Sequence, residues 1–111
     1  MLRRLAVLLL ASLPAWSQAT SGSVTGIVTD NSGAVVVSAA ITITNRDTGV
    51  VFRTQTNDVG IYAAPSLIAG PYTVDIEFAG FKKFQMRNLV LETGQKLRLD
   101  AALDEIGRAH V

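Results

Sequence analysis

The chain of 111 residues is long enough for one domain, and its 10 basic and 9 acidic residues give a formal net charge of +1. This balance leaves no basic stripe for a phosphate backbone, so it argues against nucleic acid as a partner. The chain has no cysteine. A disulfide framework is therefore excluded, and stability has to come from a packed core.

Residues 1–19 have the three-part layout of a secretory signal peptide. Arg3 and Arg4 form the positive start, and residues 5–13 are nearly all apolar. Ser17 and Ala19 then place small residues at the −3 and −1 positions of a cleavage site. The apolar run is about nine residues, whereas a membrane-spanning helix needs roughly 20. Cleavage after Ala19 is therefore expected rather than a permanent anchor, and it leaves a nearly neutral mature chain.

A polar linker is expected at residues 20–23, followed by short extended segments. Residues 24–30 are rich in valine, isoleucine and threonine, and residues 39–45 place Ala39, Ile41 and Ile43 on one face. Residues 50–56 are expected to return as the second arm of a hairpin. Turns are predicted where Asp, Asn and Gly cluster, at residues 30–33, 46–49 and 57–60.

The second half of the chain continues the pattern. A short strand at residues 61–64 is expected to end at Pro65, because proline cannot donate to a ladder, and Leu67 is expected to plug one end of the core. The clearest alternation predicts an inward face made of Tyr72, Val74, Ile76 and Phe78. Its outward face would be made of Thr73, Asp75 and Glu77.

The last segments contain one weak strand and one regular strand. Residues 81–87 are predicted as an edge, protected by Lys82 and Lys83. Residues 89–91 resume the pattern, and residues 96–103 alternate strictly. About seven short strands, with no helical periodicity outside the leader, predict an all-β fold: a seven-stranded, two-sheet β-sandwich over residues 24–104.

The residues that carry a family resemblance are 26–30, Gly33, 39–43, 56–62, Leu67, 70–74 and 80–81. This pattern resembles that of carboxypeptidase regulatory-like domains from about residue 23 to residue 103. The resemblance implies a prealbumin-like, carbohydrate-binding-like sandwich that accompanies peptidases without being one. One departure lies at Ser38, where the family usually places glycine or proline before the alanine, and it is expected to loosen a loop.

A signal peptide followed at once by such a domain is similar to the start of Oar-like TonB-dependent outer-membrane receptors. This implies a non-catalytic accessory or interaction domain on the periplasmic side of the outer membrane, or at the cell surface. Its partners would be the plug and barrel of the same receptor or a periplasmic protein. The alternative is a free carbohydrate-binding or surface-adhesion module, with a glycan as its partner.

The end of the chain breaks the alternation. Residues 105–111 correspond to the codons GAG ATC GGA AGA GCA CAC GTC, which resemble a sequencing adapter read through in frame. We therefore expect a fragment with an artefactual tail, to be set aside in reasoning about the fold.

No residue is predicted to be catalytic, cofactor-binding or metal-ligating, and no cofactor is expected. The only histidine, His110, lies in the doubtful tail, and no base accompanies a nucleophile. Residues 30–31 and 57–58 offer oxygen atoms for calcium, but each pair also has an ordinary role in a turn.

Aromatic residues are the remaining candidates for sugar binding. Four of them are assigned to the core: Phe52, Tyr62, Tyr72 and Phe78. Phe81 and Phe84 are either exposed or a cover over one end of the sandwich, and the mature chain has no tryptophan. The apolar run at residues 35–37 is assigned to packing. Open strand edges offer a further site, because a partner strand can add to them.

Overall fold

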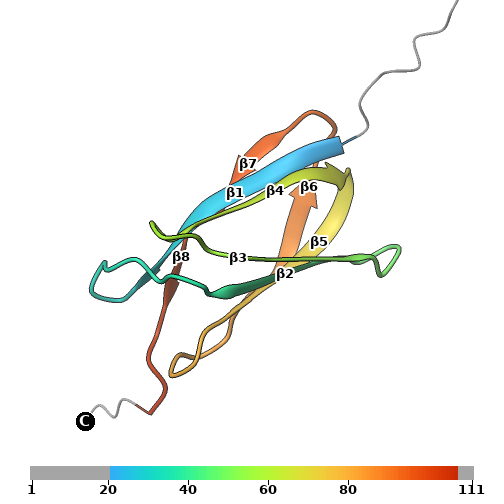
Figure 1. The fold of residues 1–111 in the computed structure, drawn as a ribbon. Helices are drawn as coiled ribbons and strands as arrows, with labels where there is room; N and C mark the ends of the chain where they lie inside the picture. Colours follow the sequence, from blue (N-terminus) through green and yellow to red (C-terminus); the bar gives the residue numbers. More distant parts are fainter. Residues whose placement is uncertain (1–20, 108–111) are drawn as a thin grey trace, which may run out of the picture.

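The computed structural model describes residues 21–107. Their alternating apolar and polar side chains are typical of β-strands, and these strands form two sheets (Figure 1). The strands are β1 (Ser21–Asp30), β2 (Ala40–Asn45), β3 (Val51–Gln55), β4 (Ile61–Ile68), β5 (Gly70–Glu77), β6 (Phe84–Leu91), β7 (Lys96–Arg98) and β8 (Ala101–Leu103). One sheet has the order β4–β1–β7, with β8 also paired to β1, and the other has the order β3–β2–β5–β6. The all-β sandwich is confirmed. The expected signal peptide lies outside the described residues.

The core fills the space between the two sheets. On β2 and β5, Ile41, Ile43, Val74 and Ile76 are completely buried, which confirms that these four residues face inward. The facing sheet contributes Val24 and Val28 of β1 and Tyr62 of β4, and Leu67 closes one end as expected.

β1 pairs in parallel with both β7 and β8, in one continuous register that joins Ser23 to Lys96 and Asp30 to Leu103. The strand expected at residues 96–103 is therefore interrupted, which gives eight strands instead of seven. The break lies at residues 99–100, where the Ile27 amide donates to the Asp100 carboxylate.

The parallel pairing also decides where the described chain enters and leaves the sandwich. It enters at Ser21 and leaves beyond Leu103, at the opposite end (Figure 1). Ten residues of β1 span the distance between these ends, which is about 30 Å at the rise of a β-strand.

Several expected boundaries are wrong. β4 continues through Pro65 to Ile68, because β4 is an edge strand paired only with β1 and its register shifts between Gly22 and Val24, opposite the proline. β1 begins at Ser21, so most of the expected linker belongs to the strand. The segments expected at residues 81–87 and 89–91 merge into one edge strand, β6, which begins only at Phe84.

The loop before β2 is tightly held rather than loosened. Ser38 adopts a positive φ of 66°, and its amide donates to the Thr56 carbonyl at 3.1 Å. The buried Thr56 hydroxyl accepts from the Ala39 amide at 2.8 Å and donates to the Val36 carbonyl at 2.7 Å. The serine at this position therefore strains the backbone, but the hydrogen bonds of the loop keep its conformation fixed.

Candidate functional site

An open cleft of about 460 Å³ lies at the loop between β5 and β6. Phe78 and Phe81 line it, with ring centroids 6.0 Å apart and planes tilted by 45°. The Phe81 amide donates to the Phe78 carbonyl at 3.0 Å, so a tight turn brings the two rings together. The cleft therefore presents an aromatic pair to solvent.

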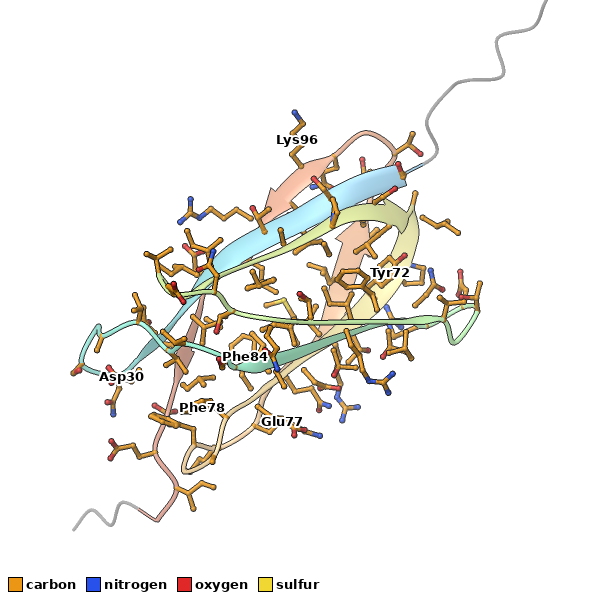
Figure 2. All side chains as sticks on the ribbon, viewed as in Figure 1. Asp30, Tyr72, Glu77, Phe78, Phe84 and Lys96 are labelled. Carbon is orange, nitrogen blue, oxygen red and sulfur yellow. The ribbon has the colours of Figure 1, made fainter. Side chains whose placement is uncertain are left out.

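The assignment of Phe78 to the core is wrong. β5 ends at Glu77, and Phe78 is 37% exposed in the loop that follows, at the end of the sandwich where the chain leaves (Figure 2). Phe81 and Phe84 are half-buried and pack against the core, as a cover over one end of the sandwich would. Phe52 is also half-buried, whereas Tyr62 and Tyr72 are buried as expected.

The charged groups at this cleft pair with each other. The Lys83 ammonium lies 3.4 Å from the Glu77 carboxylate, and both side chains are about half exposed. Ile106, which belongs to the segment expected to be an artefactual tail, forms another part of the lining, and its amide donates to the Gly80 carbonyl at 2.9 Å. An aromatic pair beside an ion pair suits binding, and it supplies no nucleophile next to a base.

A second hollow, which we call the β3–β4 groove, has a volume of about 200 Å³. Val50, Val51 and Ile68 are exposed around it, while Tyr72 and Leu67 lie buried in its lining. The groove opens between the edge strands of the two sheets, beside the turn that joins β2 to β3.

Two of the oxygen atoms considered for calcium, one on Asp30 and one on Asn57, accept hydrogen bonds within turns. One Asp30 carboxylate oxygen accepts from the Ser32 amide, the Ser32 hydroxyl and the Ala34 amide. The bonds from Ser32 hold the pKa of Asp30 below its usual value. The Asn57 side-chain oxygen accepts in the same way from the amides of Val59 and Ile61. Within residues 21–107, no three residues of the His, Cys, Asp or Glu type gather as a metal site; His110 lies outside that range.

The remaining sequence candidates are apolar or structural. Of the run at residues 35–37, Val36 is buried while Val35 and Val37 are partly exposed, and Val35 forms an isolated bridge to Thr29. Sequence reasoning missed the buried Asn45 and Thr56, since an isolated polar residue in a strand or loop gives no periodic signal. No helix within residues 21–107 has the length and apolar character needed to cross a membrane.

The family model for the carboxypeptidase regulatory-like domain matches residues 23–104. The chain belongs to this family. Members are regulatory or binding-type β-sandwiches. Among curated proteins, none matches the chain in sequence.

Solved structures share the fold of this carboxypeptidase regulatory-like domain. A protein from Bacteroides uniformis ATCC 8492, proposed to bind carbohydrate, has a TM-score of 0.60 at 23% identity, over 74% of this chain and 40% of that one. A minor pilin of Streptococcus agalactiae has a TM-score of 0.64 at 9% identity, over 84% and 48%. Catechol 1,2-dioxygenase of Acinetobacter radioresistens has a TM-score of 0.64 at 8% identity, over 85% and 57%. This chain thus spans 40 to 57% of those proteins, and identities this low show the fold alone.

Proposed function

We propose that the chain is exported and that its carboxypeptidase regulatory-like domain is a non-catalytic accessory domain of a larger TonB-dependent outer-membrane receptor. The family supports a binding or accessory role. The expected signal peptide, and its position directly before the domain, support export and the receptor context, because β1 begins two residues after the expected cleavage point at Ala19.

The observation that carries an accessory role is the parallel pairing of β1 with β7 and β8. It separates the points where the chain enters and leaves by the length of the sandwich, about 30 Å. A domain with this geometry can be placed in series between neighbouring parts of a polypeptide. It also acts as a spacer, because β1 runs from one end of the sandwich to the other and is hydrogen-bonded to β7 and β8, which keeps the two ends apart.

The experiment is to extend the reading frame of the source genome beyond residue 104 and to express the resulting protein. A plug and amphipathic barrel strands should follow, and the product should fractionate with the outer membrane after cleavage at Ala19. A Leu8→Arg variant, which interrupts the apolar run of the leader, serves as the export control and should stay in the cytosol. A stop codon or a further sandwich after residue 104, or a product that keeps its leader, would overturn the proposal.

One observation favours carbohydrate binding as the second candidate, namely the pair of Phe78 and Phe81 beside the ion pair of Glu77 and Lys83. Aromatic rings pack against the apolar faces of sugars, and charged groups bind their hydroxyls. A glycan array with the wild type, Phe78→Ala and Val90→Ala tests it, since Val90 is also an exposed apolar residue but lies outside the cleft. Binding lost only in Phe78→Ala supports this candidate, and silence across the array removes it.

A further inference from the structure

The sandwich of residues 21–107 has edge strands on both sheets, and β3 differs from the others in having no proline, no register shift and more than three residues; its only charged side chain is Arg53. β4 carries Pro65 and a register shift, and β6 carries a register shift and follows two lysines. β7 and β8 have only three residues each. Proline, bulges, lysines and shortness are the usual means by which proteins prevent pairing at an edge. β3 instead pairs with β2 over five consecutive residues without a shift.

The backbone of β3 presents a regular row of free groups. At one end the Asn45 amide donates to the Val50 carbonyl, and at the other the Thr56 amide donates to the Ala39 carbonyl. Hydrogen bonding alternates along an antiparallel pair, so residues 50, 52, 54 and 56 turn their backbone groups toward β2. Val51, Arg53 and Gln55 therefore turn their N–H and C=O groups outward, where a further strand would lie.

The β3–β4 groove lies beside this row and has room for a side chain. Val50 is 64% exposed and Ile68 is 62% exposed at its rim, and the groove measures about 200 Å³. A cavity of about 150 Å³ accommodates benzene, so the groove accepts a leucine or phenylalanine side chain. The side chains of an added strand alternate between the two faces, and the one opposite Phe52 points to the side where the groove lies.

Asn45 in the lining of the groove has an unused donor. It is 4% exposed, and its side-chain oxygen accepts from the amides of Asp47 and Thr48. Its Nδ2 group has no acceptor among the residues that the structure describes. This nitrogen lies next to Gly70 at the start of β5, on the side of β2 that faces away from β3, so Asn45 shapes the lining of the groove and is not counted as a contact for a strand added at β3.

Charge decides between a foreign strand and a second copy of this chain. Arg53 is exposed on β3 and makes no ion pair within residues 21–107. If two copies paired through β3 in the register that uses all three outward residues, Arg53 of one copy would lie directly opposite Arg53 of the other. Like charges in that position destabilise a strand pair. A strand with a carboxylate opposite Arg53 fits better.

We propose that the edge of β3 binds an extended strand of another polypeptide, with an apolar side chain in the β3–β4 groove and a carboxylate opposite Arg53. The inference rests on the proposed accessory role and specifies its contact surface. Affinity comes from backbone hydrogen bonds to residues 51, 53 and 55, and selectivity comes from the groove and the arginine.

The test uses the protein purified after expression of the full chain and the probe acetyl-Ser-Thr-Leu-Asp-Leu-Thr-Ser-amide, followed by amide NMR up to about 1 mM peptide. Its sequence is the same in either direction, so both strand orientations are sampled. We expect shifts and slowed hydrogen exchange at the amides of Val51, Arg53 and Gln55. The same peptide with lysine in place of aspartate should bind about tenfold more weakly.

Two variants separate docking from folding. Arg53→Pro removes an N–H that has no partner in the sandwich, and it should weaken binding at least about tenfold while the remaining spectrum stays native-like. Ile68→Gln alters the exposed rim of the groove without touching the β3 backbone, and it should weaken binding as well. Val90→Gln, an equally exposed apolar position on β6, is the control and should bind normally.

Absence of shifts in β3 at the highest peptide concentration would overturn the inference, as would shifts confined to the Phe78–Phe81 cleft. Self-association of the wild type that disappears in Arg53→Pro would assign the edge to a second copy and would also overturn it. None of these results depends on the reading frame beyond residue 104, so the proposed receptor context stands or falls separately.

Discussion

The backbone amide of Ile27 donates a 3.0 Å hydrogen bond to the side-chain carboxylate of Asp100, in the middle of a parallel ladder. Four residues earlier on both strands, the Ser23 amide donates to the backbone carbonyl of Gln95 at 2.8 Å. By that pattern the Ile27 amide should meet the Leu99 carbonyl. A side chain has therefore taken the place of a backbone acceptor.

The displaced carbonyl has another partner. The hydroxyl of Tyr62, which is almost completely buried on β4, donates to the Leu99 carbonyl at 2.6 Å. Tyr62 lies opposite Gly26 in the β1–β4 register, so its ring reaches across β1 at a position that has no side chain. Gly26, Tyr62 and Asp100 thus act together in an exchange of hydrogen-bond partners: Asp100 accepts the bond from the Ile27 amide, and Tyr62, passing Gly26, donates to the Leu99 carbonyl. These bonds connect β1 and β4 to the segment between β7 and β8.

Replacing Asp100 tests this exchange. Asp100→Ala leaves the Ile27 amide without its acceptor and should lower the free energy of unfolding by about 1 kcal/mol, a modest value because the bond is exposed to water. Asp100→Asn keeps a side-chain oxygen and should cost less. Urea denaturation measures both, with Arg98→Gln as the control, since it breaks the Arg98–Asp100 ion pair but keeps the carboxylate. Equal losses in Asp100→Asn and Asp100→Ala would contradict a role for the oxygen as acceptor.

Asp100 also predicts a pH dependence. The Ile27 amide, and after it Arg98, hold the pKa of Asp100 below its usual value. A lowered carboxyl pKa stabilises the fold above the unfolded-state pKa of about 3.9, and this contribution is lost as the pH falls through the folded-state value. Below about pH 4, the melting temperature of the wild type should therefore fall more steeply with decreasing pH than that of Asp100→Asn. Parallel curves would show that other carboxyl groups, such as Asp30, account for the acid sensitivity.

At alkaline pH the sensitive group is Tyr62. Burial, and secondarily the charge of Asp100, raise the pKa of Tyr62 to about 12. Because the folded state favours the protonated phenol, the stability it provides is complete below the unfolded-state pKa of about 10 and is lost as the pH rises toward the folded-state value. Urea midpoints measured between about pH 9 and 12 should fall for the wild type. In Tyr62→Phe this part of the decline should be missing.

The same variant has a cost at neutral pH. Tyr62→Phe leaves the Leu99 carbonyl without its hydroxyl partner and should lose about 1–2 kcal/mol. Tyr72→Phe removes a hydrogen bond of equal length, to the Ile68 carbonyl, at a less buried site, and it should lose less. A larger loss in Tyr72→Phe would contradict the importance assigned to the partner exchange.

Local alternation in the sequence was enough to predict the strands that lie inside a sheet. β2 and β5 have neighbours on both sides, and their inward residues Ile41, Ile43, Val74 and Ile76 follow the period of two without exception. The candidate aromatic site was only partly predictable. Phe78 continues the alternation of β5, yet the strand ends one residue before it because the turn to Phe81 takes over.

The features that the sequence did not predict depend on contacts between residues that are distant in the sequence. The break at residues 99–100 exists because Tyr62 takes the Leu99 carbonyl, and no pattern within residues 96–103 reports that. Pro65 is tolerated because β4 happens to be an edge with a register shift. The β3–β4 groove is lined by residues of four strands. The sequence therefore indicated that open strand edges exist, but it could not indicate that the edge of β3 lies beside a groove.

Gly26 should be the least replaceable glycine of the domain. A methyl group there would lie 1.8 Å from the Leu99 carbonyl oxygen and 2.9 Å from the Tyr62 ring. Since one contact is with the backbone between β7 and β8 and the other with a side chain of β4, Gly26→Ala should cost about 3 kcal/mol or more and separate β1 from β7 and β8. Gly94→Ala is the matched control, because nothing lies within 4 Å there and only its positive φ is unfavourable; it should cost about 1 kcal/mol. A mild effect at Gly26 would show that the strands can move apart freely.

Ser38 offers the opposite change, a substitution to glycine that stabilises. Its φ of 66° is unfavourable for a residue with a side chain. The hydrogen bond from its amide to the Thr56 carbonyl holds it in this conformation. Ser38→Gly keeps that bond and removes the strain, at the cost of a more flexible unfolded chain. The net gain should be about 0.5 kcal/mol in urea denaturation, because relief of roughly 1 kcal/mol of strain exceeds the entropic loss.

The neighbouring position provides the control for this gain. Val37 is partly exposed and has no positive φ, so Val37→Gly adds chain flexibility without relieving strain and should destabilise by about 0.5–1 kcal/mol. Ser38→Val, with a branched side chain at a positive φ, should destabilise by more than about 1 kcal/mol. If Ser38→Gly and Val37→Gly changed stability in the same direction, the hydrogen bonds of Thr56 rather than the backbone angle would set the energy of this loop.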